Sequence, residues 1–276
     1  MNAPCRLALL ATLPPFLAAC SSPQPGNTVN VPTTQATSAS PATASTPLTP
    51  AAATPATPTM PANWSTWRVG GDLFTKPEFR EDSYYSGKCS ITTPLPEGYP
   101  APTPPGAIEL KRYPTVRRAE MSMDASKNIS SQSGRNLAFW PLFNHIQKRE
   151  IAMTSPVEMN YPQMKIDSAA EAKSESQLTS AWTMSFLYRT TDMGPLGDDG
   201  KVQVVDVAPM TVLSIGMMGP YLASRDIAAL DQLRTWLAAN PQWRAAGPAR
   251  SLYYNGPDVI PARQWSEMQV PIEPAV

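Results

Sequence analysis

Ile151-Ala152-Met153-Thr154-Ser155-Pro156-Val157-Glu158-Met159-Asn160-Tyr161 alternates between two kinds of side chain. The odd positions of this stretch are apolar except for Ser155, and the even positions are small or polar. A period of two residues predicts a β-strand with one face in the core and one face in water. Because Pro156 has no backbone N–H, we expect the strand to lie at a sheet edge or to contain a bulge.

The same alternation recurs later in the chain and predicts four more strands. The apolar residues that carry it are Trp182, Met184, Phe186 and Tyr188, then Val202, Val204 and Val207, then Leu213, Ile215 and Met217, and finally Met268, Val270 and Ile272. Gly194-Pro195 and Asp198-Asp199-Gly200 mark turns between these strands.

Two helices are predicted among the strands. The first lies within residues 136–149, where apolar side chains recur at helical spacing at Phe139, Phe143 and Ile146. Because Pro141 would remove a hydrogen bond from the helix interior, we expect the helix to begin close to Trp140 or to kink there.

The second helix is predicted from Arg225 to about Ala239, with Ser224 as its N-cap. Its apolar face consists of Ile227, Leu230, Leu233 and Trp236. Strands that surround two separated helices predict an antiparallel α+β domain. A helix followed by strands occurs twice, which suggests two pseudo-repeated halves, although no convincing repeat is seen at the level of residues.

The N-terminus has the pattern of a cleavable export signal, with one positive charge at Arg6 before a short apolar run. Leu17-Ala18-Ala19-Cys20 resembles the lipobox of bacterial lipoproteins. The resemblance implies a signal peptide at residues 1–19 and a lipid anchor on Cys20. Ser21 implies, by the same resemblance, sorting to an outer membrane, with display on either side of it left open. The alternative is an ordinary secretory signal with a chance cysteine.

The rest of the chain divides by composition. Residues 20–62 contain no charged residue and consist mostly of Pro, Thr, Ala and Ser, so we expect a disordered linker of polyproline character. Residues 63–106 form an extension that is first aromatic and then proline-rich, and we expect its aromatic part to pack on the main domain at 107–276. Cys89 is the only cysteine after Cys20, so no disulfide is expected within the domain.

The charge balance and the motifs exclude several function classes. The chain has 22 Lys and Arg residues against 22 Asp and Glu residues, which gives no electrostatic reason to expect nucleic acid as a partner. HExxH, GxSxG, CxxC and P-loop motifs do not occur in the sequence. A single histidine cannot build a multi-histidine metal site. The sequence therefore favours binding over catalysis, and we do not expect an enzyme.

Several segments, taken in order, resemble the SOUL haem-binding family. They are Ile108 to Pro114, Ala138 to Ile146, Ile151 to Val157, Trp182 to Phe186, Tyr254 to Pro257 and Glu267 to Ile272. The resemblance covers residues 107–274. It implies a distorted, mainly antiparallel β-barrel flanked by two helices, with a shallow apolar pocket that takes up haem or another tetrapyrrole. Trp140-Pro141 departs from the family pattern, in which a charged pair is expected.

The candidate haem-binding residues are His145, Phe139, Phe143, Met153, Trp182 and Arg149. His145 is the only imidazole and therefore the natural ligand for a haem iron, although by helical count it lies away from the apolar face and could point to solvent. The aromatic rings and the Met153 thioether suit a tetrapyrrole, and Arg149 suits its propionates. A protein core would use the same apolar residues, and a solvated surface would use the same arginine.

The leading hypothesis is an envelope lipoprotein that binds haem or a related tetrapyrrole for scavenging, buffering or transfer. The first alternative is a non-catalytic interaction or structural lipoprotein that uses the same fold without haem. A weaker alternative is an enzyme acting on a small amphiphile, with Glu109 or Glu158 as a buried acid of raised pKa.

Overall fold

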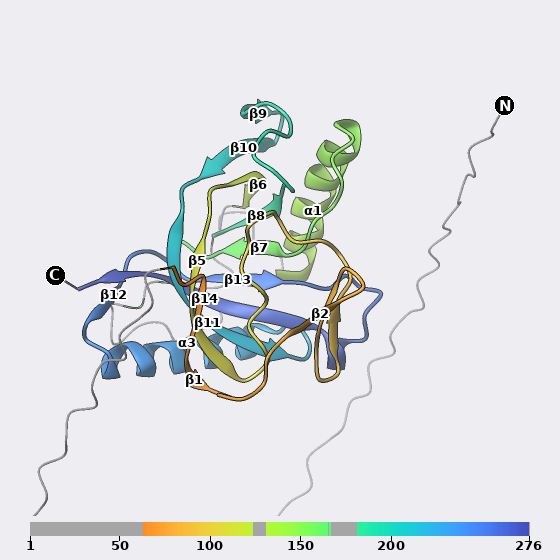
Figure 1. Cartoon of the computed structure of the whole chain (residues 1–276). Coiled ribbons are helices and arrows are strands. Elements are labelled where there is room, and N and C mark those ends of the chain that lie inside the picture. Colours follow the sequence, from red (N-terminus) through yellow and green to blue (C-terminus); the bar gives the residue numbers. More distant parts are fainter. Residues whose placement is uncertain (1–62, 124–130, 165, 167–180, 276) are drawn as a thin grey trace, which may run out of the picture. The chain divides into compact units, whose positions relative to one another are not determined.

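One large antiparallel sheet, with two helices packed on it, organises the chain (Figure 1). The computed structural model describes residues 63–123, 131–164, 166 and 181–275. The predicted signal peptide, Cys20 and the proline-rich linker lie outside the described residues. The helices are α1 (Ser131–Lys148) and α3 (Ala223–Ala239), and neither is both long and apolar enough to cross a membrane.

The large sheet has eleven strands. Ten follow one another in the order β1 (Thr66–Gly71), β5 (Ala107–Tyr113), β11 (Met210–Met218), β14 (Trp265–Pro274), β13 (Arg250–Tyr253), β7 (Val157–Asn160), β8 (Trp182–Leu187), β6 (Val116–Met123), β10 (Val202–Val207) and β9 (Gly197–Asp199), while β12 (Trp243–Ala245) pairs with β14. Along this path β1 and β9 are the two ends of the sheet, so the sheet is open. The α+β prediction is confirmed, and the predicted barrel is corrected to an open sheet.

The sheet is built from two halves with the same order of elements. Apart from the short strands β9 and β12, one half reads β5–β6–α1–β7–β8 and the other reads β10–β11–α3–β13–β14. β7 of the first half pairs with β13 of the second at the centre of the sheet. The first strand of each half pairs with the second strand of the other half, because β5 pairs with β11 and β10 pairs with β6. The predicted two halves are thus present, with their first strands exchanged.

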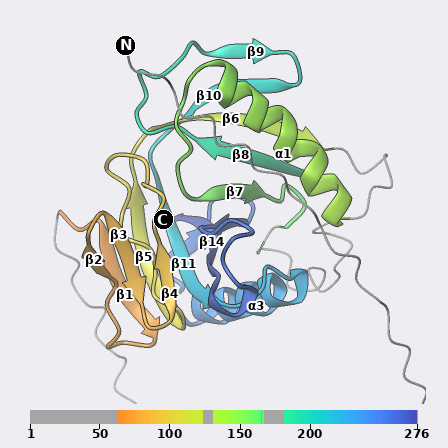
Figure 2. The ribbon, with the colours of Figure 1, turned by 90° about the vertical axis from the view of Figure 1, so that its right-hand side faces the viewer.

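Both helices cover the same face of the sheet (Figure 2). α1 packs on β6 and β8, and α3 packs on β11 and β14. Strand pairing shows that the two helices share this face. Ser251 pairs with both Met159 and Met268, and Met159 in turn pairs with Met184. Alternation places these side chains on one side of the sheet, where they form the main core with Leu142 of α1 and Leu230 of α3.

Three local expectations are wrong. Only residues 157–160 of the alternating stretch form a strand, and that strand, β7, lies at the centre of the sheet rather than at an edge. Pro156 directly precedes β7, where its missing N–H removes no ladder hydrogen bond. α1 begins at Ser131 and continues through Pro141. The N-cap residue of α3 is Leu222, without a side-chain cap, and Ser224 lies inside the helix.

The opposite face of the sheet is covered by an N-terminal arm, defined here as residues 63–106. β1 extends the large sheet at β5, and a separate three-stranded sheet follows, formed by β2 (Glu78–Arg80), β3 (Ser83–Ser86) and β4 (Cys89–Ile91). Its buried side chains form a second core with the large sheet that consists of Cys89, Ile91, Leu95, Tyr113, Val212, Leu252, Tyr254 and Trp265.

The last part of the arm, residues 93–106, is a strap that touches the backbone of β11. A Cβ atom on Gly216 would lie 2.3 Å from the backbone oxygens of Thr103 and Pro104, so only glycine lets the strap approach this closely. The Gly106 N–H donates to the Gly216 carbonyl at 2.9 Å. The strap is therefore an integral layer of the fold, and the arm lies against a sheet face that would otherwise be open.

Candidate functional site

α1 buries a different stripe from the one that its aromatic residues indicate. Ala138, Leu142, His145 and Ile146 face the sheet, whereas Phe139 and Phe143 are half-buried beside this stripe. His145 is only 4% exposed, so the expectation that it points to solvent is wrong.

Both ring nitrogens of His145 have protein partners. Nδ1 lies 2.8 Å from Asp199 Oδ2, and Nε2 lies 2.7 Å from the Tyr188 hydroxyl. Arg149 donates to the same Asp199 oxygen from Nε and Nη2, at 3.2 and 3.0 Å. The hydrogen bonds from His145 and Arg149 lower the pKa of Asp199. This cluster ties β9 to the C-terminal end of α1.

A group of aromatic rings lies on the flank of α1. The rings of Phe139 and Phe143 stack with centroids 5.7 Å apart and planes 15° apart, and Phe186 of β8 meets Phe139 edge-on. Trp140 stands edge-on to both phenylalanines and is 58% exposed. Leu137 beside it is 52% exposed. We call Leu137, Phe139, Trp140 and Phe143 the α1 aromatic face.

The other predicted residues do not join this face. Trp182 is buried in the main core, to which Met159, Met184 and Met217 also belong. Met153 follows α1 and lines a separate cleft, described below. The six candidates thus fall in four places, and Trp140, which the sequence analysis noted only as a departure, is the most exposed aromatic residue of α1.

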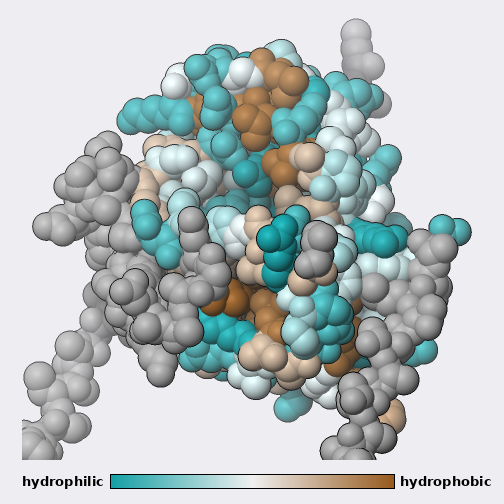
Figure 3. Space-filling view, turned by 90° about the vertical axis from the view of Figure 1, so that its left-hand side faces the viewer, coloured by the Kyte–Doolittle hydropathy of each residue, from teal (hydrophilic) through white to brown (hydrophobic). Residues whose placement is uncertain are grey.

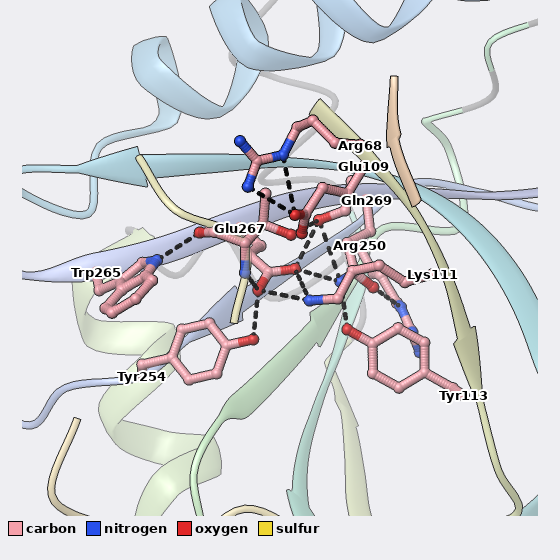
Figure 4. A network of polar contacts seen from close by, with 11 residues as sticks. Arg68, Glu109, Lys111, Tyr113, Arg250, Tyr254, Trp265, Glu267 and Gln269 are labelled. Atoms are coloured by element: carbon pink, nitrogen blue, oxygen red, sulfur yellow. Dashed lines mark hydrogen bonds and ion pairs between the residues drawn. The ribbon is translucent and has the colours of Figure 1, made fainter. Parts of the chain in front are cut away.

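A fully buried carboxylate, Glu267 of β14, is the centre of a polar network under the arm (Figure 4). Its donors, at 2.6–3.1 Å, are the Thr103 N–H, Lys111 Nζ, Ser214 Oγ, the Tyr254 hydroxyl and Gln269 Nε2. Burial raises the pKa of Glu267, but the Lys111 charge and these hydrogen bonds outweigh it and lower the pKa overall. The Thr103 contact comes from the strap, so this network also fastens the arm.

A second buried carboxylate, Glu158 of β7, continues the network. Arg118 and Arg250 both pair with it, and Arg250 also donates to Gln269 at 3.0 Å. Burial raises the pKa of Glu158, and the two arginines lower it further than burial raises it. Glu109 pairs in the same way with Arg68 of the arm. The two acids considered for catalysis are therefore both paired with arginines, and the pKa of Glu158 is lowered rather than raised.

One cleft of about 620 Å³ opens between the arm and the main domain. Its lining residues are Phe79, Asp82, Tyr84, Thr93, Pro94, Leu95, Pro96, Glu97, Gly98, Tyr99, Ala152, Met153, Thr154 and Arg189. We call it the arm cleft. Its volume lies within the range of small-molecule sites. Another face of the molecule, seen in Figure 3, shows hydrophobic residues as small patches scattered among hydrophilic ones.

The residues fit a tetrapyrrole in part. The α1 aromatic face and the arm cleft both offer aromatic surface to a flat apolar ring. In this structure His145 offers no free nitrogen to iron, because Tyr188 and Asp199 occupy both. Met153 in the arm cleft carries a thioether, and Tyr84 and Tyr99 carry hydroxyls, which are ligand types that haem iron accepts. Within the described residues, no three His, Cys, Asp or Glu side chains gather as a metal site.

Comparison with known proteins identifies the family. The family model described as "SOUL heme-binding protein" matches residues 100–271, which is most of the folded domain. A search of the curated proteins finds no match to the chain.

Among solved structures, the EcmrR C-terminal domain is 16% identical, with a TM-score of 0.48, and the match covers 61% of this chain and 98% of that chain. A hydrolase from Listeria innocua is 11% identical, with a TM-score of 0.43, over 63% of this chain and 94% of that chain. At this level of similarity nothing about function follows from either protein.

Proposed function

Because this chain belongs to the SOUL heme-binding protein family, we propose that it is a lipid-anchored envelope protein that binds haem or a related tetrapyrrole for scavenging, buffering or transfer. The family match carries the proposal, since it spans both helices and every strand of the large sheet except β1 and the last residues of β14. The arm cleft supports it, because the cleft presents aromatic side chains at the surface of the described domain. Haem would supply an iron centre to the complex, and the protein would supply binding and orientation.

The envelope location is supported by the N-terminal sequence. The apolar run and Leu17-Ala18-Ala19-Cys20 match a lipoprotein signal, and the uncharged stretch that follows would serve as a tether. Radiolabelled palmitate should enter the wild-type protein and not a Cys20→Ser variant when both are produced in a Gram-negative host. Equal labelling of the two proteins would overturn the anchor.

A haemin titration of residues 20–276, followed through the Soret band, tests the binding. We expect saturable one-to-one binding. The His145→Ala variant identifies the iron ligand, because a band that shifts in this variant would assign His145 and an unchanged band would exclude it. No saturable binding by the wild-type chain would refute the proposed function.

The alternative of an interaction lipoprotein has one observation in its favour. Leu73 and Phe74 are strongly exposed on a turn after β1. The turn is held by Arg68, which donates to the carbonyls of Asp72 and Thr75. Large apolar residues presented on a fixed turn mark a contact site. A photoreactive side chain at position 74 should then cross-link to one defined partner in cells, and the same probe at position 140 should not.

A further inference from the structure

The arm cleft is enclosed by segments that are far apart in the sequence. Phe79, Asp82 and Tyr84 come from the small sheet of the arm, and residues 93–99 come from the strap. Residues 152–154, which follow α1, and Arg189, which follows β8, complete it from the main domain. Ten of the fourteen lining residues therefore precede the family match, which begins at residue 100.

Hydrogen bonds fix the strap along the main-domain side of the cleft. The Ser155 N–H donates to the Pro94 carbonyl at 2.9 Å, and the Glu97 N–H donates to the Arg189 carbonyl at 2.9 Å. The Arg189 guanidinium also donates to the Leu95 carbonyl. These bonds anchor the strap to the loop that carries Met153 and to the segment that follows β8. The cleft is thus formed before any ligand arrives, which lowers the entropy lost on binding.

The arm contributes apolar and aromatic surface to the cleft. Phe79 is 61% exposed, and its ring centroid lies 4.7 Å from that of Tyr84 with the planes tilted by 48°. Tyr99 reaches the cleft from the strap and is held edge-on against Tyr113, with centroids 4.7 Å apart. An exposed phenylalanine beside a preformed cleft gains free energy when a flat apolar molecule covers it.

The main domain contributes a guanidinium and a thioether to the cleft, whereas the carboxylates of Asp82 and Glu97 come from the arm. Arg189 is partly exposed, and within the described residues it forms an ion pair with Glu97, at 3.7 Å. A bound carboxylate at closer range would form a stronger, charge-assisted contact with this guanidinium. Met153 is half-buried at the cleft, where its polarisable thioether suits contact with a ring or with iron.

We propose that the tetrapyrrole lies in the arm cleft, with its ring against Phe79 and Met153 and a propionate on Arg189. The inference rests on the proposed function and names the place where the ligand is held. It assigns a binding role to the arm, most of which precedes the family match. The α1 aromatic face is not part of this site and therefore provides the control variant. A tetrapyrrole fits this cleft because it is flat, apolar in its ring and anionic at one edge.

Titrations of residues 20–276 with haemin and with iron-free protoporphyrin IX test the site. Phe79→Ala should raise the Kd for both ligands about fivefold to tenfold, because part of one aromatic contact is lost. Arg189→Gln should raise both Kd values by about threefold to tenfold, because a charged contact to a carboxylate is lost. Met153→Leu keeps the side-chain volume, and a changed haemin Soret band with an unchanged protoporphyrin Kd would show that its sulfur meets the iron.

Trp140→Ala is the matched control, because Trp140 is as exposed as Phe79 and lies on the α1 aromatic face. Its Kd should equal that of the wild type. If Trp140→Ala weakens binding while Phe79→Ala and Arg189→Gln do not, the arm cleft is refuted and the proposed function stands. If the wild-type chain binds neither ligand, both the proposed function and the arm cleft as its site are refuted. Circular dichroism of each variant checks that the fold is retained.

Discussion

The Tyr188 hydroxyl lies 2.7 Å from Nε2 of His145, at the position from which an iron atom would approach that ring. Asp199 holds the other ring nitrogen at 2.8 Å. The only imidazole in the chain therefore joins α1 to β9 and to the residue that follows β8 through two hydrogen bonds, and its present geometry is that of a structural connection.

Tyr188→Phe should lower the free energy of unfolding by about 1–2 kcal/mol, because it leaves Nε2 of the buried His145 without a partner. Urea unfolding of the variant and the wild type measures the difference. Tyr84→Phe is the control. If Tyr188→Phe were as stable as the wild type, the hydrogen bond would not contribute to the stability of the fold. If it bound haemin more tightly than the wild type, His145 would be within reach of iron after all.

Glu267→Gln should destabilise the protein by about 3 kcal/mol or more, since it leaves the fully buried Lys111 without a counter-charge. Adding Lys111→Met to this variant should restore part of the loss, because the unpaired charge is then removed as well. Glu273→Gln breaks the exposed pair with Arg244 and should change stability by less than about 1 kcal/mol. Equal effects of the two glutamine substitutions in urea unfolding would contradict the role of burial.

Asp226 of α3 makes the free energy of unfolding decrease as the pH rises. Burial raises its pKa to about 6, although Tyr253 donates a hydrogen bond to it at 2.7 Å. The native state then holds the Asp226 proton more tightly than the unfolded chain, so this group lowers stability as the pH rises from about 4 to about 6.

Asp226→Asn removes that charge and keeps an acceptor for the Tyr253 hydroxyl. At about pH 7 the variant should be more stable than the wild type by up to about 3 kcal/mol, and at about pH 4 the difference should largely vanish. Urea unfolding at both pH values measures the two differences. A gain of the same size at both would mean that the effect does not come from ionisation.

Gly216→Ala should loosen the strap, because the new Cβ would lie 2.3 Å from the backbone oxygens of Thr103 and Pro104. Limited proteolysis should then cut within residues 93–106 faster than in the wild type. Gly70→Ala is the matched control, since its Cβ would meet only ordinary contacts at 3.6 Å. Equal cleavage rates in the two variants would show that the close approach at Gly216 does not hold the arm in place.

Alternation predicted which side chains of each strand face the main core. Met268, Val270 and Ile272 do face the helix side of β14. The pattern could not show that the other face, with Glu267 and Gln269, is also buried, because the segment that covers it comes from residues about 160 positions earlier. A covered polar face and a wet one have the same sequence period.

The candidate site was less predictable for a similar reason. Phe139 and Phe143 share helical spacing with Ile146, and this spacing predicts that they lie on the buried face of α1. In the structure His145 is more buried than either phenylalanine. The partners that allow an imidazole to be buried are Tyr188 and Asp199. Tyr188 directly follows β8 and Asp199 is in β9, so both are far from His145 in the sequence. The arm cleft depends on three distant segments, and no local motif in Phe79 or Arg189 indicates that they meet.

The exchange of first strands between the two halves has a consequence for how the chain reaches its fold. β5 cannot pair until β11 has been made, and β13, which joins the halves by pairing with β7 at the centre of the sheet, comes still later in the sequence. Neither half can complete its hydrogen bonding while the other is still being made, and such long-range pairing folds slowly. A chain synthesised from its N-terminus therefore cannot complete the sheet until β13 has been made.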